Sequence, residues 1–168
     1  MKLTRVERWM LANQYQILER LDPENSKDHE TCRIALERGY ELSYETCAKN
    51  IFETVLSAEE CEEVVAILSM FRALRQSTEE LTDKTGIDLR DVQFDGFDGN
   101  NDTKQLAYPE FFCTRQNRFS ELNVRNSHMP VLGGYRSMRR VWESCVNKYQ
   151  PTKEEVVAIA KARYPKTS

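Results

Sequence analysis

Polar side chains that could do chemistry gather in two turn-rich segments of the chain. Residues 94–102 are rich in Asp, Gly and Asn, and residues 118–128 contain basic, amide and imidazole groups. Such groups can bind a polar ligand or act as general acids and bases. The candidate ligand-binding residues are Asp95, Asp98, Asn100, Arg118, Asn126 and His128.

The acidic segment invites comparison with a metal-binding loop. Asp98, Asn100 and Asp102 alternate as at the start of an EF-hand, but Thr103 stands where that loop needs Gly. Pro109 stands where the bidentate Glu belongs. We therefore predict a turn and no metal site, with a Mg²⁺ ion on the carboxylates of this segment as the alternative.

His128 is the histidine with possible catalytic neighbours, since Ser127 adjoins it and Cys113 lies in the same half of the chain. Neither the turn that carries a hydrolase serine nor a papain-like cysteine motif surrounds them. An Asn-Ser-His loop bonded to its own backbone is the favoured interpretation. Because phosphate-binding loops are also missing from the sequence, we predict no cofactor, and no enzyme class is identified.

The elements that position these segments are expected to be helices. Three helix starts carry a capping box, in which a hydroxyl residue is followed three residues later by Glu. The three pairs are Thr4 with Glu7, Ser57 with Glu60, and Thr152 with Glu155. Apolar spacing and breaker residues predict helices over residues 5–21, 25–38, 43–52, 57–81, 103–116, 135–149 and 153–162.

We predict a mainly α fold, a helical bundle in two subdomains of residues 1–86 and 87–168. The boundary is placed where the composition changes to turn residues, and residues 92–94 form at most a short strand. The first helix has an apolar stripe that calls for a partner helix, interrupted by Asn13. The stripe consists of Leu3, Val6, Met10, Ile17 and Leu21.

Charge is unevenly distributed along the chain. Residues 1–86 contain 11 basic and 17 acidic side chains, whereas residues 103–149 contain eight basic and three acidic ones. The Arg-rich region could contact an acidic partner. Nucleic-acid binding is not favoured, because the whole chain has a net charge of −3. The longest apolar run, Val64 to Leu68, is far shorter than the roughly 20 residues of a membrane span, so none is predicted. Charges at Arg5, Glu7 and Arg8 interrupt the apolar residues of the amino terminus, which predicts no signal peptide. The five cysteines form no paired motif, so we expect a cytoplasmic protein.

Several motifs together resemble the YfbU family of bacterial proteins. They begin with N-Q-Y-Q-I-L-E-R-L-D-P at residues 13–23 and E-R-G-Y at 37–40. They continue with S-M-F-R-A-L at 69–74 and V-Q-F-D-G-F-D-G-N at 92–100. R-F-S-E-L, N-S-H-M-P and the frame of Met138, Trp142 and Tyr149 complete a collinear likeness over nearly the whole chain. The resemblance implies a predominantly helical protein and supplies no accepted catalytic residue.

Two functions follow from these observations. The first is a non-enzymatic interaction or regulatory protein that forms a homo-oligomer through its helices, suggested by the apolar stripe and the uneven charge. The second is a small-molecule or phosphoryl-processing hydrolase with a site between the subdomains, formed by the six candidate residues. A structure decides between them by showing whether Asp98 and His128 share a pocket.

Overall fold

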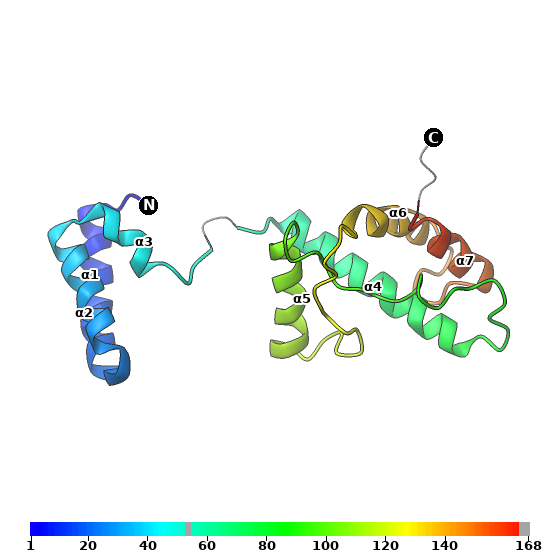
Figure 1. The fold of residues 1–168 in the computed structure, drawn as a ribbon, viewed down its shortest axis with the longest axis horizontal. Helices are drawn as coiled ribbons and strands as arrows, with labels where there is room; N and C mark the ends of the chain where they lie inside the picture. The colour runs from blue at the N-terminus through cyan, green and yellow to red at the C-terminus, as the bar shows by residue number, and fades with distance from the viewer. Residues whose placement is uncertain (53–54, 165–168) are drawn as a thin grey trace. The chain divides into compact units, whose positions relative to one another are not determined.

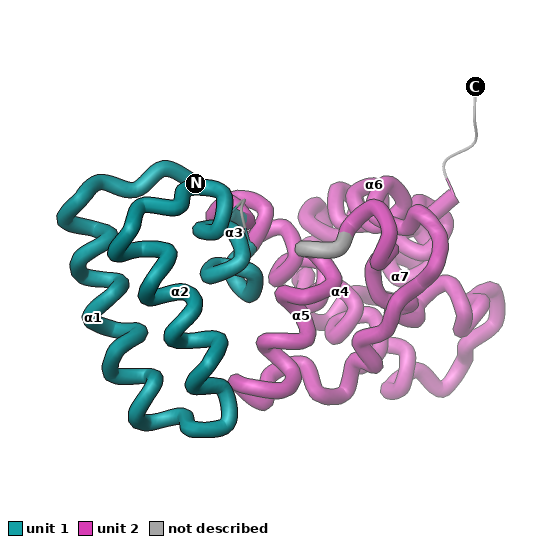
Figure 2. The backbone as a smooth tube through the Cα atoms, turned by 60° about the vertical axis from the view of Figure 1, so that its left-hand side comes forward, with its two compact units in different colours: residues 1–55 teal, residues 56–168 magenta. Residues whose placement is uncertain are grey.

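The computed structural model of the protein describes residues 1–52 and 55–164, and for residues 103 and 104 the backbone alone. All regular elements in this part of the chain are helices, which confirms the mainly α prediction (Figure 1). The chain divides into two compact units, Met1–Val55 and Leu56–Ser168 (Figure 2). Each unit has its own hydrophobic core.

Unit 1 is an antiparallel pair of helices followed by short helical turns (Figure 2). Its elements are α1 (Arg5–Leu21), the 3₁₀ turn η1 (Pro23–Asn25), α2 (Ser26–Arg38), the 3₁₀ turn η2 (Glu41–Ser43) and α3 (Tyr44–Cys47). Gly39 ends α2 in the left-handed conformation, with a φ of 75°, as expected for a helix terminator. The core is small, because only Ala12, Leu36 and Tyr44 form its buried cluster.

Unit 2 is built around one long helix. Its elements are α4 (Ala58–Glu80), α5 (Thr103–Arg115), α6 (Leu132–Glu143) and α7 (Lys153–Lys161). Helix α4 contacts each of the other three, and its buried side chains recur at helical spacing along the contact face. They include Val64, Ile67, Leu68, Phe71 and Leu74, none of which is exposed to solvent.

Local sequence explains where α1, α4 and α7 begin. The capping boxes at Thr4, Ser57 and Thr152 are all present with both reciprocal hydrogen bonds, which confirms the three predicted starts. Each box gives partners to backbone N–H groups that the first helical turn leaves unpaired.

Two helices differ in extent from the prediction. The helix expected over 43–52 is a single turn, Tyr44–Cys47, which continues as hydrogen-bonded turns to Ile51. The helix expected over 135–149 is α6, Leu132–Glu143, which begins three residues and ends six residues before the predicted bounds. Glycines are tolerated in its first turn, and Gly134 allows the carbonyl of Arg163 to approach to 2.8 Å from where a Cβ would lie.

The predicted boundary at residues 86 and 87 lies inside unit 2. Val92, Phe94 and Phe97 are buried in the same core as α4, so the turn-rich segment belongs to that core. Residues 92–94 form no strand, and the β-type pairing in the described chain is an isolated parallel bridge between Phe97 and Asn126.

Candidate functional site

The two polar segments identified from the sequence meet in unit 2. The backbone N–H of Ser127 donates to the carbonyl of Phe97 at 3.0 Å, and Gly99 N–H donates to Asn126 Oδ1 at 2.9 Å. A Cβ on Gly96 would lie 1.6 Å from the carbonyl oxygen of Arg125, so the two backbones are in direct contact. We call this junction of residues 95–101 with residues 125–128 the loop clasp.

Asp98 shapes its own segment of the loop clasp. The side chain is 2% exposed, and its two oxygens accept hydrogen bonds from Asn101 Nδ2 at 2.6 Å and Asn100 N–H at 3.0 Å. The bond from Asn101 is the main cause that lowers the pKa of Asp98, and the charge of His128 contributes least. Asn126 Oδ1 accepts from the N–H groups of Gly99 and His128, so His128 lies near the Asp98 turn, but the Asp98 carboxylate is used in forming that turn.

Asp95 connects the loop clasp to the rest of unit 2. Its carboxylate pairs with Arg125 at 3.2 Å and with the buried guanidinium of Arg163. Arg163 also donates to three carbonyls of residues 90–93, and its guanidinium lies 5.4 Å from the ring centroid of Tyr135. Asp95 N–H in turn donates to the Tyr135 hydroxyl oxygen at 3.0 Å. Arg163 and Tyr135 are thus positioning residues of the clasp.

The remaining candidates do not all converge. Asn126 Oδ1 accepts from both Gly99 N–H and His128 N–H, which supports a left-handed φ of 54° at His128. The backbone of Asn100 belongs to the Asp98 turn. Arg118 instead stacks over aromatic rings, with its guanidinium 5.0 Å from Phe112. Five of the six predicted residues therefore belong to the loop clasp, and Arg118 lies elsewhere.

Sequence reasoning missed Arg163 and Tyr135, because the local sequence of each contains no polar motif. Their roles come from partners about 40 to 70 residues away in the chain, such as Asp95. In the part of the chain that the structure describes, no three His, Cys, Asp or Glu side chains are grouped so that they could hold a metal ion.

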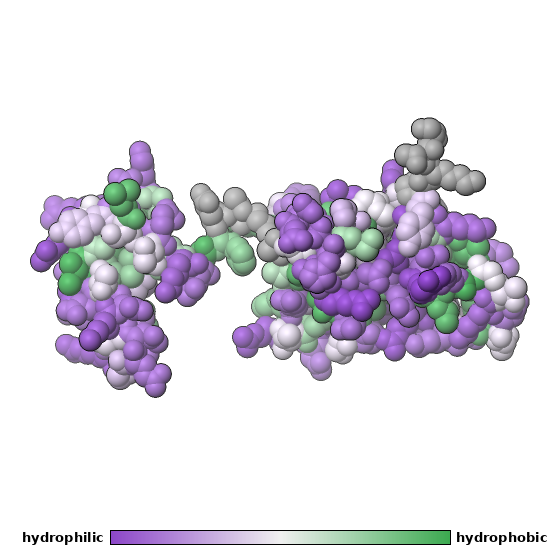
Figure 3. All heavy atoms as spheres, viewed as in Figure 1, coloured by the Kyte–Doolittle hydropathy of each residue, from purple (hydrophilic) through white to green (hydrophobic). Residues whose placement is uncertain are grey.

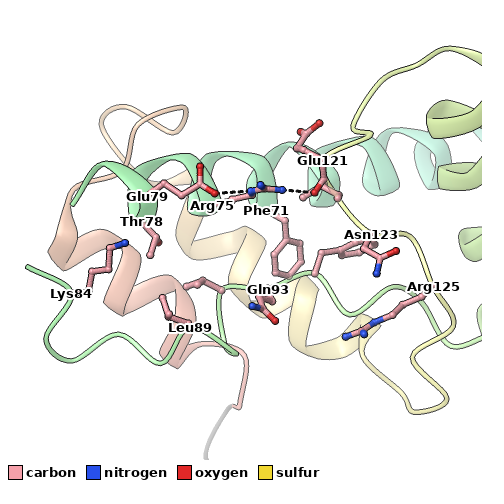
Figure 4. Close-up of a pocket in the computed structure, with 13 residues that line it drawn as sticks. Phe71, Arg75, Thr78, Glu79, Lys84, Leu89, Gln93, Glu121, Asn123 and Arg125 are labelled. Carbon is pink, nitrogen blue, oxygen red and sulfur yellow. Dashed lines mark hydrogen bonds and ion pairs between the residues drawn. The ribbon is translucent and has the colours of Figure 1, made fainter. Parts of the chain in front are cut away.

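A pocket of about 490 Å³ lies beside the loop clasp, under the C-terminal half of α4 (Figure 4). Its walls come from three parts of unit 2: α4, residues 84–94 and residues 121–125. Figure 4 shows Phe71 pointing from α4 into the pocket and Arg75 between Glu79 and Glu121. Arg125 is shared by the pocket wall and the loop clasp.

Three arginines of the Arg-rich region, Arg125, Arg136 and Arg139, are paired with carboxylates within unit 2. Arg136 makes a bidentate contact with Glu63 of α4 at 2.8 and 2.9 Å, and this contact is the main cause that lowers the pKa of Glu63. Arg139 donates to Glu143 at 2.6 Å. Because these guanidinium groups already pair with carboxylates, they are less available to an acidic partner.

A second surface lies on unit 1. The predicted apolar stripe of α1 does not face α2, because α1 packs on α2 through Ala12 and its neighbours Leu11 and Tyr15. Leu3, which precedes the helix, packs against the core of unit 1, whereas the other four members of the stripe lie on the opposite side of α1 and are open to solvent. The exposed members of the stripe are Val6, Met10, Ile17 and Leu21, with Trp9 beside them. Figure 3 shows apolar residues among polar ones on the visible face of unit 1.

Fold and surfaces together define a mainly helical protein of two units, with an open apolar helix face on one unit and a pocket on the other. The model of the YfbU domain matches residues 1–162. The chain therefore belongs to the YfbU family, which confirms the resemblance seen in its motifs. Across the described residues, no helix combines the length and the apolar character needed to cross a bilayer.

Proposed function

We propose that the protein is a cytoplasmic, self-associating interaction or regulatory protein, and that two copies pair through the open face of α1. The observation that carries this proposal is the exposure of five large apolar side chains on one face of a single helix. Their exposed fractions range from 51% to 75%. Contiguous apolar surface of this kind is typical of protein interaction sites. The free thiols of all five cysteines agree with a reducing compartment.

The spacing of the α1 face suits a second helix. Val6, Met10, Asn13 and Ile17 follow one another at intervals of four, three and four residues, which is the spacing of a helix–helix seam. Unit 1 has few buried apolar residues, so a second helix on this face would bury apolar surface that unit 1 alone leaves exposed.

Charge favours an antiparallel copy of α1 as the occupant. Residues 2–8 contain three basic and one acidic side chain, whereas residues 19–24 contain three acidic and one basic. Antiparallel pairing places these opposite charges next to each other and also opposes the two helix dipoles. Asn13 is at the centre of Arg5–Leu21, so it meets its own counterpart, where two side-chain amides can hydrogen-bond.

The hydrolase alternative receives less support from the geometry. Both carboxylate oxygens of Asp98 accept hydrogen bonds within its own turn. The guanidinium of Arg118 stacks on Phe112, away from the loop clasp. An acid–base pair needs a free carboxylate or imidazole aimed at a shared reacting position. The interaction role needs no such arrangement.

The substitution Ile17→Lys tests the proposal. A charge in the centre of an apolar seam removes the burial of Ile17 in both copies, which is about 1.5–3 kcal/mol for each side chain. We expect the dimer dissociation constant to rise roughly a hundredfold or more. Light scattering coupled to size-exclusion chromatography measures the mass over a range of protein concentrations.

Val146→Lys is the matched control, since Val146 is a fully exposed aliphatic residue of unit 2, outside the α1 face. This variant should associate like the unchanged protein. A monomer at every concentration of the unchanged protein would overturn the proposal. Equal masses for Ile17→Lys and the unchanged dimer would show that copies associate through another surface.

A further inference from the structure

Two thiols of unit 1 lie against each other, although the sequence contains no paired cysteine motif. Cys32 belongs to α2, and Cys47 is the last residue of α3, which packs on α2 (Figure 2). The side chains of Cys32 and Cys47 are in hydrogen-bonding contact with each other. The chain reversal that follows Gly39 thus brings together two sulfur atoms that are distant in the sequence.

Tyr15 of α1 contacts both cysteines. Its hydroxyl donates to the backbone carbonyl of Cys47 at 2.9 Å and is also in hydrogen-bonding contact with the Cys32 side chain. One hydroxyl group therefore holds the Cys32 sulfur beside the backbone of Cys47. Both cysteines are half-buried, so a small oxidant in the solvent can reach them.

The surroundings give the two thiols different roles. Burial, followed by the hydrogen bond with Cys32, raises the pKa of Cys47 to about 12. Burial, followed by the charge of Cys32, raises the pKa of Tyr15 to about 12 as well. Both groups therefore keep their protons at neutral pH. Because the thiolate is the reactive form of cysteine, Cys32 is the member of the pair that an oxidant meets first.

We propose that Cys32 and Cys47 form a reversible disulfide when the protein meets hydrogen peroxide. The Cys32 thiolate attacks one peroxide oxygen, the O–O bond breaks, and Cys32 becomes a sulfenic acid as hydroxide leaves. The Cys47 sulfur then attacks the Cys32 sulfur, and the S–O bond breaks as water leaves with the Cys47 proton. In total the two thiols lose two electrons and two protons, and the peroxide is reduced to two water molecules.

The disulfide crosslinks α3 to α2 and closes a loop of about 15 residues, which restricts the unfolded chain. Unit 1 has a small core, so a covalent link between its helices should have a large effect on its stability. Tyr15 packs on that core and not on the open face of α1, so the disulfide does not depend on self-association. The second step should be slow, because Cys47 yields little thiolate.

Peptide mapping by mass spectrometry tests the pair in the full chain. The protein is treated with hydrogen peroxide, its free thiols are blocked with N-ethylmaleimide in denaturant, and the digest is searched for linked peptides. We expect a link between Cys32 and Cys47, lighter by two hydrogen atoms than the two separate peptides, which dithiothreitol removes. The thermal midpoint of unit 1 should rise by roughly 10 °C or more on oxidation at constant protein concentration.

Cys47→Ser separates the two steps. This variant lacks the second sulfur, so dimedone, a reagent for sulfenic acids, should label Cys32 after peroxide treatment. Cys113→Ser is the matched control, because Cys113 is also half-buried but its thiol donates to the carbonyl of Phe119 at 3.5 Å. Cys113→Ser should form the same disulfide as the unchanged protein. Ile17→Lys should form it too, which separates this proposal from self-association.

Three results would overturn the proposal. The first is complete blocking of both Cys32 and Cys47 by N-ethylmaleimide after peroxide treatment. The second is oxidation of Cys32 to an unlinked sulfinic acid, or its linkage to a second copy of the chain, while Cys47 stays free. The third is a thermal midpoint of unit 1 that does not move in the fully crosslinked protein, since the link would then not constrain α3 and α2.

Discussion

Gly96 shows at the scale of single residues how closely the loop clasp is packed. Its φ is +92°, a conformation that L side chains rarely adopt, and a Cβ would lie 1.6 Å from the carbonyl oxygen of Arg125. Gly96→Ala must therefore adopt a strained backbone and also push the two segments apart. We expect unit 2 to lose about 2–4 kcal/mol, the sum of backbone strain and weakened hydrogen bonds between the segments. Urea unfolding measures this loss.

Gly86→Ala is the control for the strain alone. Gly86 has a similar φ of +86°, but no atom lies within 4 Å of the position of its added Cβ. It should lose only the cost of the left-handed backbone, about 1 kcal/mol. If both variants lost the same free energy, the close approach at Gly96 would contribute nothing to the stability of the clasp.

The candidate residues illustrate what local sequence can and cannot predict about a site. The turn at Asp98 was predictable because it depends on local sequence alone. The Asp98 carboxylate accepts from the backbone N–H of Asn100, two residues further on. The junction with Asn126 depends on packing between distant segments, and the sequence indicated only that both are rich in polar residues. Arg118 was expected to join the other candidates, but its long side chain covers Phe112 instead of facing the clasp.

At the scale of elements, the contact between Glu63 and Arg136 fastens α6 to α4. The Glu63 side chain is 18% exposed, and the bidentate geometry holds its pKa below the ordinary value of 4.5. A carboxyl group with a lowered pKa in the folded state contributes stability above its unfolded pKa. That contribution is lost as pH falls through the folded pKa. Arg136 is half exposed, so solvent screening limits the contribution to about 1 kcal/mol.

Glu63→Gln should therefore lower the free energy of unfolding by about 1 kcal/mol at pH 7. The difference from the unchanged protein should shrink between about pH 5 and pH 3, where Glu63 becomes protonated. Denaturant unfolding at several pH values gives both quantities. Glu79→Gln removes a more exposed pair within α4 and should cost only about 0.3 kcal/mol. A difference that grew with acidity would contradict this assignment.

The elements also show which helix ends can be predicted. The starts at Thr4, Ser57 and Thr152 are encoded within four residues, so the sequence located each of them. In the first turn of α6, Gly134 lies close to the carbonyl of Arg163, a residue far away in the chain. Local propensity at Gly133 and Gly134 indicated a loop, and tertiary packing overrode it.

At the scale of the whole molecule, the two units differ in how much core they contain. Unit 1 has three residues in its buried cluster, whereas the core of unit 2 brings together all four helices and both polar segments. Composition suggested a boundary near residue 86 because the turn-rich segment looks like a linker. Burial of its apolar residues, Phe94 and Phe97 among them, makes that segment part of a core instead.

This difference predicts two thermal transitions with different dependence on protein concentration. If unit 1 is stabilised by pairing of α1, mass action raises its midpoint as the concentration increases. For a unit of this size, a tenfold increase should raise the midpoint by roughly 5 °C or more. The unit 2 midpoint should stay constant. Far-UV circular dichroism follows both transitions, and Ile17→Lys should remove the concentration dependence of the first. A first transition that does not move with concentration in the unchanged protein would mean that unit 1 is stable without a second copy.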